Sequence, residues 1–378
     1  MAALVFAIAT VILWLVWPRR QRHAPPIAEH SDMPIDGLTA EERAEFAEGN
    51  VLFDAPAREI DGLGPLYIRT SCGACHEDAV RGPGLVQKLA DGTSARPLLA
   101  AGAKTPIIAG ATASKRIGPP LLGRGWIEAV LGSEIERAMQ EQQQRSDGIR
   151  GRVSRVVYAS EPGADERFDP HHKGDLVIGR FGLKARSGAL EDFVADALQN
   201  DMGLTTVLRP HEPANPDGLV DDAKPGIDIG EPGIRLRTAY VRLLAIPKRP
   251  DGTSTKGREI FDRTRCSACH VPSLHTRADY PVRAIADRDA MIYSDLLLHD
   301  MGDTLEDGIS EGSAGPRDWR TAPLIGLRFL RQLMHDGRAS GVAEAIRAHG
   351  GEAAPAVALF EALGEPDRVA LVEFVSGL

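Results

Sequence analysis

The sequence predicts a mainly α-helical fold of two tandem domains with long loops and a small β-hairpin. Three observations support this: several stretches have helical periodicity, one short cysteine motif occurs twice, and a weak repeat relates the two halves. The 378 residues suffice for about two to three domains of ordinary size. The 39 glycines and 26 prolines agree with long loops, because both residues favour turns.

The first helix after the N-terminal region is predicted over Ala40–Leu52, where Thr39 is a typical N-cap and acidic residues fill the first turn. Apolar residues at helical spacing predict a further helix over Trp126–Gln144. The remaining predicted helices are Leu190–Gln199, Thr238–Ile246, Lys256–Thr264 and Pro366–Ser376. Valines within Gly151–Arg180 favour a hairpin, whereas Gly82–Pro120 offers few periodic runs.

All four cysteines belong to two copies of the motif C-x-x-C-H, namely Cys72-Gly73-Ala74-Cys75-His76 and Cys266-Ser267-Ala268-Cys269-His270. This motif is the attachment signal for c-type haem. The two thiols add to the vinyl groups of the porphyrin, and the imidazole that follows binds the iron. The sequence therefore predicts two covalently bound haem c groups, with His76 and His270 as the proximal iron ligands.

Zinc binding, thiol redox chemistry and disulfide formation fit the cysteines less well. Paired cysteines of a structural zinc site usually lie within about 20 residues of each other, but 190 residues separate Cys75 from Cys266. A thioredoxin-like pair needs a single motif between a strand and a helix. Disulfides within C-x-x-C are rarer still. An aromatic content of only 5% also fits an interior that a further group helps to fill.

The chain is predicted to be exported. Residues 1–20 begin with an apolar run and are interpreted as a signal anchor or signal peptide, followed by a polar tether over residues 21–38. The basic residues that follow the run would favour a cytoplasmic location for the rest of the chain. Haem attachment to C-x-x-C-H takes place on the exported side in bacteria, so we expect a periplasmic protein anchored to the inner membrane.

Each half is predicted to hold one haem motif: an N-terminal haem domain over residues 39–238 and a C-terminal one over residues 239–378, after a linker-like stretch at Pro210–Gly233. Two short matches relate the halves. Pro120-Leu121-Leu122-Gly123 matches Pro323-Leu324-Ile325-Gly326, and Ser187-Gly188 with Glu191 matches Ser340-Gly341 with Glu344. This pattern is typical of a duplicated haem domain.

With these motifs the chain resembles the bacterial di-haem oxidoreductases described as peroxidase-like or thiol oxidoreductases, which are similar to di-haem cytochrome c peroxidases. The matching stretches are Gly62–Tyr67, Asn200–Thr205, Asp295–Gly302, Arg320–Leu324, Met334–Ala339 and His349–Ala353. The resemblance implies two cytochrome-c-type domains whose haems are close enough to exchange electrons.

The sixth iron ligands decide whether such a protein is an enzyme, because a firmly held ligand gives an electron-transfer haem and an open position lets an oxidant bind. The resemblance favours His349 for the second haem, with Met301 as the second choice. Met202 is the candidate for the first haem. His171 and His172 occupy a polar loop and are expected to be solvated.

Peroxide reduction also needs a group that moves a proton between the peroxide oxygens. The similar peroxidases use a glutamate near Met202, and this chain has Asp201 there, which we interpret as the catalytic candidate. His335 and Arg338 are expected beside the haem propionates.

Three functions stay open. The first is an oxidoreductase that takes electrons from a small carrier protein and reduces a peroxide or similar small oxidant. The second is a membrane-anchored electron-transfer cytochrome with both haems six-coordinate, and the third is a sensor or assembly partner that uses haem only for folding. The net charge of −9 argues against a nucleic-acid partner, which would need a basic surface.

Overall fold

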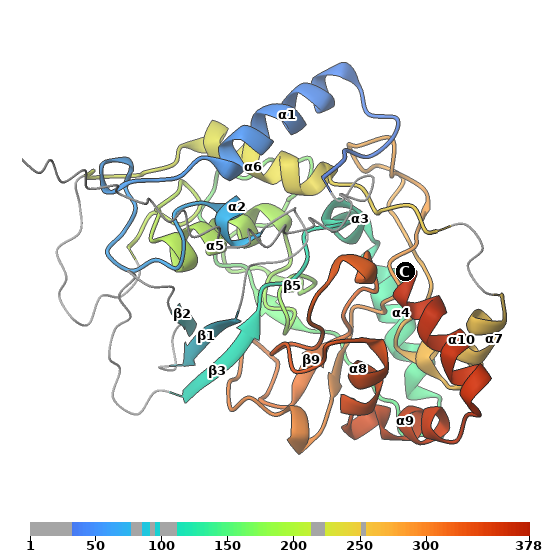
Figure 1. Ribbon diagram of the computed structural model, residues 1–378. Helices are drawn as coiled ribbons and strands as arrows, with labels where there is room; N and C mark the ends of the chain where they lie inside the picture. Colours follow the sequence, from blue (N-terminus) through green and yellow to red (C-terminus); the bar gives the residue numbers. More distant parts are fainter. Residues whose placement is uncertain (1–31, 77–84, 91–94, 99–111, 213–223, 251–254) are drawn as a thin grey trace, which may run out of the picture.

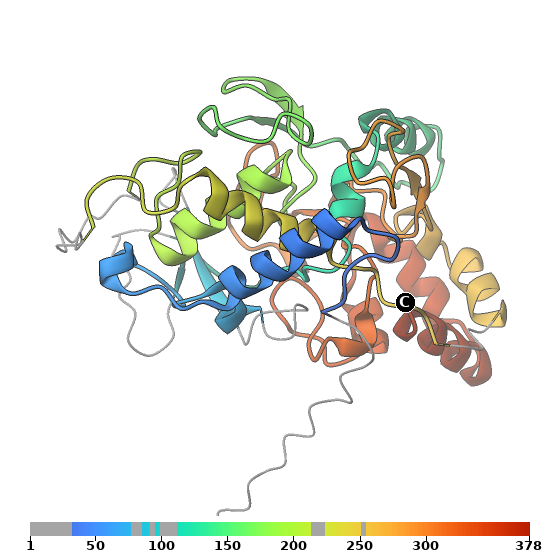
Figure 2. The same cartoon turned by 90° about the horizontal axis from the view of Figure 1, so that it is seen from above.

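The computed structural model describes residues 32–76, 85–90, 95–98, 112–212, 224–250 and 255–378. Its helices form two groups (Figures 1 and 2). In the first, α6 contacts α1, α3 and α5. In the second, α10 contacts α7 and α8, and α8 contacts α9. The helices are α1 (Ala40–Asp54), α2 (Cys72–Cys75), α3 (Arg124–Ala129), α4 (Gly132–Gln143), α5 (Leu190–Met202), α6 (Glu231–Leu243), α7 (Thr255–Arg263), α8 (Val342–Ala348), α9 (Ala354–Glu361) and α10 (Glu365–Ser376).

The described strands are short and antiparallel, which agrees with a mainly α fold. A three-stranded sheet has the order β2-β1-β3, and the other sheets are two-stranded. The strands are β1 (Leu85–Ala90), β2 (Ala95–Leu98), β3 (Thr112–Ile117), β4 (Arg155–Val157), β5 (Leu176–Ile178), β6 (Leu274–His275), β7 (Asp289–Ala290), β8 (Leu298–Asp300) and β9 (Asp318–Arg320). The pairing of β4 with β5 confirms the predicted hairpin.

Local capping sets the start of α1 where the sequence predicts it. The Thr39 side chain accepts a hydrogen bond from the backbone of Glu42, whose carboxylate in turn accepts one from the Thr39 backbone. This reciprocal capping box satisfies two amide groups that the first helical turn leaves unpaired.

The single helix predicted over Trp126–Gln144 is wrong in one respect, because the structure has two helices there, α3 and α4. Val130 pairs with Thr276 in a β-bridge, and the Leu131 amide donates to the His275 carbonyl oxygen. Both residues have extended backbone angles. A contact with a segment far along the chain therefore overrides the local helical preference.

The helix predicted over Thr238–Ile246 begins earlier and ends earlier, at Glu231 and Leu243. Pro232 fits the first turn of α6, because the amide that proline lacks would have no helical hydrogen-bond partner there. The linker predicted up to Gly233 therefore ends earlier, before Glu231. Beyond Leu243 the chain pairs with the segment before α1: the Ala245 amide donates to the Met33 carbonyl oxygen.

The largest buried cluster takes residues from both sides of the predicted domain boundary. It extends from Ile35 to Ile325 and includes Tyr240 and Leu243 of α6. The boundary between residues 238 and 239 falls inside α6. The division into two haem domains stays a prediction.

The two Pro-Leu-x-Gly turns of the repeat lie against each other. Gly123 and Gly326 both adopt a left-handed conformation and both precede a helical turn. A Cβ on Gly123 would lie 2.9 Å from Cδ1 of Ile325, and a Cβ on Gly326 would lie 2.8 Å from Cδ1 of Leu122. Each turn thus packs its glycine against the apolar residue that precedes the other glycine.

Among the described residues, no helix has the length and apolar character needed to cross a membrane. The predicted signal segment 1–20, and most of the tether, lie outside the described residues.

Candidate functional site

Each C-x-x-C-H motif lines its own cavity. The first cavity has a volume of about 740 Å³ and contains Cys72, Cys75 and His76 in its wall. The second has a volume of about 240 Å³ and contains Cys266, Cys269 and His270. The two cavities share three wall residues: Pro119, Arg124 and Leu183.

The first motif forms the one-turn helix α2. The Ser71 hydroxyl accepts a hydrogen bond from the Ala74 amide and caps this turn. The His76 amide donates to the Cys72 carbonyl oxygen, and the His76 ring lies 6.2 Å from the ring of Phe53. Burial raises the pKa of the Cys72 thiol to about 11. The turn brings both sulfur atoms and the imidazole to the same cavity wall.

Helix α5 also lines the first cavity, and the two sequence candidates Asp201 and Met202 lie at its C-terminal end. Asp201 and Met202 line the cavity. Gly203 ends the helix in a left-handed conformation, and the Gly64 amide donates to the Met202 carbonyl oxygen. Met202 also packs in the buried cluster against Leu198 and neighbouring apolar residues.

A loop around Tyr293 fixes the second motif. Nδ1 of His270 lies 3.1 Å from the Tyr293 carbonyl oxygen, and since a carbonyl only accepts, Nδ1 carries the proton. The Asp295 amide donates to the Cys269 carbonyl oxygen. Tyr293 is buried with a φ of 50°, which costs a non-glycine residue about 1–2 kcal/mol. This strained residue aims its carbonyl group at the imidazole and leaves Nε2 available for a metal.

His349 faces His270 across the second cavity. Their ring centroids are 6.5 Å apart, close to the spacing of about 6 Å expected for two imidazoles on opposite sides of one iron. Nδ1 of His349 donates to the Ala345 carbonyl oxygen, 2.6 Å away. Burial lowers the pKa of both rings, that of His270 to about 4. Two neutral imidazoles, each with its free nitrogen available, fit a haem iron.

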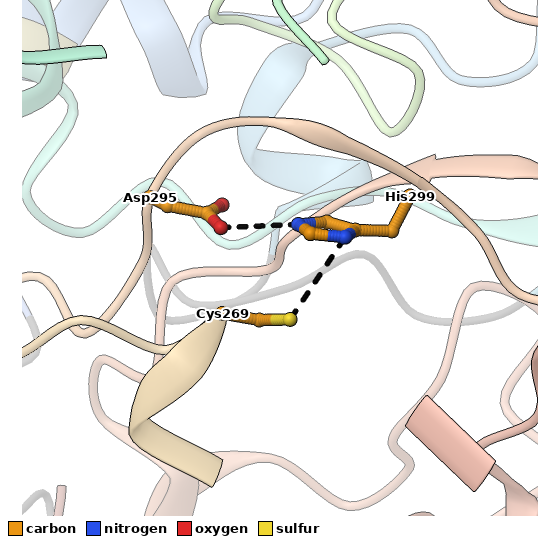
Figure 3. Close-up of side chains that lie close together, drawn as sticks. All are labelled: Cys269, Asp295 and His299. Carbon is orange, nitrogen blue, oxygen red and sulfur yellow. Dashed lines mark hydrogen bonds and ion pairs between the residues drawn. The ribbon is translucent and has the colours of Figure 1, made fainter. Parts of the chain in front are cut away.

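His299 forms a buried contact beside the second attachment site (Figure 3). Its Nε2 lies 3.0 Å from Asp295, its Nδ1 lies 2.8 Å from Glu352, and Cys269 Sγ lies 3.9 Å from Nδ1. Burial alone would lower the pKa of His299, but the carboxylates, above all Asp295, raise it well above its usual value. The second cavity therefore has a buried imidazolium at its edge.

The four cysteines do not converge on one metal ion, since the two pairs line separate cavities. Within the described part of the chain, the one group of three or more Cys, His, Asp or Glu side chains close enough to share an ion is Cys269, Asp295 and His299. Both ring nitrogens of His299 already face carboxylates. This arrangement fits a charged hydrogen-bond network better than a metal site.

The remaining sequence candidates are placed as follows. Met301 lines the second cavity, as does His335, which stacks on Trp319 with centroids 3.8 Å apart. Arg338 donates to Asp336 and to the Thr304 carbonyl oxygen. His171 and His172 line neither cavity.

Comparison with known proteins assigns a family. The model of the family described as "Di-haem oxidoreductase, putative peroxidase" matches residues 109–378, well over half of the chain. The chain belongs to this family. Haem is therefore its cofactor and its role is a redox one. The matched range contains the second motif and begins after the first one.

One solved structure is similar over most of its length: hydrazine synthase from Kuenenia stuttgartiensis, pressurised with xenon. It shares 15% sequence identity, with a TM-score of 0.42, and the match covers 94% of this chain and 92% of that one. No curated protein matches the chain.

Several residues of this di-haem oxidoreductase were not anticipated from the sequence. The carbonyl group of Tyr293 contacts His270, and no local pattern marks it. The carboxylate of Glu352 contacts His299; it belongs to the matching stretch His349–Ala353, which assigns it no role. In the first cavity, Asp196 and Arg186 form an ion pair. The internal repeat could have indicated Asp196, because the offset that relates Ser340 to Ser187 also relates His349 to Asp196.

Proposed function

We propose that this protein is a di-haem c-type cytochrome that passes electrons from the C-terminal to the N-terminal haem, where a peroxide or similar small oxidant is reduced. Cys72, Cys75, Cys266 and Cys269 hold the haems as thioethers, and His76 and His270 are the proximal ligands. When bound, haem supplies an iron that exchanges single electrons and, at an open axial position, binds a small oxidant.

The difference between the two cavities carries this proposal. In the second, the facing pair His270 and His349 offers both axial ligands, 6.5 Å apart. In the first, His76 is the only histidine among the described lining residues, and the cavity is about three times larger, 740 Å³ against 240 Å³. The second site suits electron transfer, whereas the first has room for an additional small molecule.

The residues of each cavity have distinct tasks. Tyr293 and Ala345 hold the protons of the two imidazoles away from the metal position, with Met301 as the weaker alternative to His349. Met202 is the thioether within reach of the first cavity, and a thioether is a ligand that an oxidant can displace. A carboxylate of α5 moves the proton; the sequence favours Asp201 for this role.

The electron donor is expected to be a small carrier protein. The shared wall of Pro119, Arg124 and Leu183 supports direct exchange between the two sites, because residues that line both cavities place them next to each other. Localisation in a bacterial periplasm, with the N-terminal segment as an inner-membrane anchor, follows from the haem-attachment chemistry and the apolar run at residues 1–17.

One observation favours the alternative of a non-catalytic, membrane-anchored electron-transfer cytochrome. Met202 lines the first cavity and is held at a fixed helix end. If its thioether stays on the iron in every redox state, both haems are six-coordinate and no oxidant binds.

Spectroscopy and turnover of the haem-loaded protein separate the two functions. We expect the half-reduced protein to reduce hydrogen peroxide, with one low-spin haem and one haem that changes spin state when peroxide or cyanide is added. Two low-spin haems that stay unchanged after partial reduction, with no peroxide consumption, would contradict the catalytic proposal and support the electron carrier.

A further inference from the structure

The repeat pairs His349 of the second cavity with an aspartate in the first. Glu191 corresponds to Glu344, and the same offset brings Asp196 to the position of His349. In the second cavity that position faces the proximal histidine. Asp196 lines the first cavity, which also contains the proximal histidine of the first motif. The repeat thus relates an imidazole in the wall of the second cavity to a carboxylate in the wall of the first.

Asp196 is buried and held by three donors. Arg186 forms an ion pair with its carboxylate, Nη1 of Arg209 lies 3.3 Å away, and Nδ2 of Asn200 donates to it at 3.1 Å. Donors that bind the ionised form of a carboxylate keep it charged. Arg186 and Arg209 also line the cavity. The Asp196 carboxylate and its two positively charged partners therefore border the same cavity.

The residue before Arg186, the ion-pair partner of Asp196, has a strained backbone conformation. Ala185 is fully buried and has a φ of 50°, a conformation that costs a non-glycine residue about 1–2 kcal/mol. Such strain is concentrated at functional sites. Gly182 leaves room for the arginine, since a Cβ there would lie 3.1 Å from Cγ of Arg186. The guanidinium group also lies over the ring of Phe193.

Among the described residues, three carboxylates line the first cavity: Asp196, Asp201 and Glu311. Glu311 is engaged by Arg116 in a buried cluster with Asp307. Asp201 lies at the end of α5, where its charge acts on Cys72 and is secondary to burial in raising the pKa of that thiol. Among the described carboxylates of this wall, only Asp196 combines the repeat position of His349 with an ion pair to Arg186.

We infer that Asp196 is the proton-transfer group of the first cavity and that Arg186 stabilises the charge that develops on the oxidant. This rests on the proposed reduction of a small oxidant. With hydrogen peroxide, an Asp196 carboxylate oxygen accepts the proton of the oxygen nearer the iron and returns it to the other oxygen. The O–O bond breaks and one water leaves. The remaining oxygen becomes the second water after it takes up two electrons from the carrier protein and two protons from solvent.

The test compares Asp196→Asn with Asp201→Asn in the haem-loaded protein. Loss of a positioned acid–base group lowers a rate about 10²–10⁴-fold, so we expect peroxide reduction to fall at least about 100-fold in D196N and by a smaller factor in D201N. Cyanide binding gives a second readout. Hydrogen cyanide must lose its proton to bind iron, so its association with the first haem is expected to slow in D196N by a similar factor.

Two further variants separate chemistry from folding. Asp196→Glu keeps a carboxylate and is expected to recover part of both rates, and Arg186→Lys keeps the charge but loses the planar fork. Haem content and the Soret band report on folding. Parent-like rates in D196N together with slow rates in D201N would overturn the inference in favour of Asp201. A parent protein that neither reduces peroxide nor binds cyanide would refute the proposed function itself.

Discussion

Each cavity contains one C-x-x-C-H motif, and the two differ at the repeat position that holds His349 in the second. In the second, His349 stands 6.5 Å from His270 and the cavity is small. In the first, the equivalent position holds Asp196, paired with Arg186, and the cavity is large. Exchanging an imidazole for a carboxylate removes a strong iron ligand and supplies a proton acceptor. This one position distinguishes the proposed electron-transfer site from the proposed site of oxidant reduction.

The largest expected effect comes from removing one pair of cysteines. Cys266→Ser with Cys269→Ser should abolish covalent haem at the second cavity and leave the first haem in place, because the two motifs line separate cavities. The intact mass should fall by one haem, and haem absorbance by half. The reciprocal change at Cys72 and Cys75 should give the same result. Loss of both haems from either variant would show that the cavities do not load independently.

The next effect concerns the iron ligand that distinguishes the second cavity. His349→Gly should convert the second haem from low-spin to high-spin, since the facing imidazole is lost. Electron paramagnetic resonance of the oxidised protein measures this. Met301→Leu, in the same cavity wall, should leave the spectrum unchanged. The opposite pair of results would make Met301 the ligand.

A stability difference of about 3–5 kcal/mol is expected from His299→Gln, because it leaves two buried carboxylates without their charged partner. The pKa of His299 is raised in the folded protein, so its contribution is complete below the unfolded value of about 6.5 and is lost as pH rises through the raised pKa. The pKa values of Asp295 and Glu352 are lowered, although burial opposes this, so their contribution is lost as the pH falls towards them.

Urea unfolding of parent and H299Q should therefore differ most near pH 6 and less at pH 10. His275 offers a matched control: it also lies between two aspartates, but on the surface, where ion pairs contribute little. His275→Gln should leave the unfolding midpoint almost unchanged. An equal effect of both variants would mean that burial at the second cavity has no special role.

A small change in stability is expected from Met202→Leu, below about 1.5 kcal/mol, since the swap nearly conserves side-chain volume in a buried cluster. Its spectroscopic effect is informative nevertheless. We expect the resting first haem to shift towards high-spin while the second stays low-spin. An unaltered spectrum would remove Met202 as an iron ligand.

Local signals account for what the sequence predicted correctly. The motif spacing brought Cys72, Cys75 and His76 to one cavity wall, and the Thr39 cap set the start of α1. Long-range contacts account for the errors. The break between α3 and α4 depends on the pairing of Val130 with Thr276, far along the chain, and no window of sequence contains both partners.

The polar surroundings of the two sites could be predicted only in part. His349 was found because it follows a helix in a stretch that resembles the family, whereas Asp196 is one of 53 acidic residues and stands out only when the two halves are aligned. The role of Tyr293 lies in its backbone carbonyl group, which any residue would supply. Chemistry carried by the backbone leaves no mark in the sequence.

The reciprocal packing of the Pro-Leu-x-Gly turns, with Gly123 against Ile325 and Gly326 against Leu122, is the kind of self-complementary contact that joins identical subunits about a two-fold axis. In a symmetric dimer every substitution is present in both copies, so neither site can change alone. In a chain that carries two copies, as the repeat predicts here, that restriction is absent, so one half can keep histidine while the other acquires aspartate.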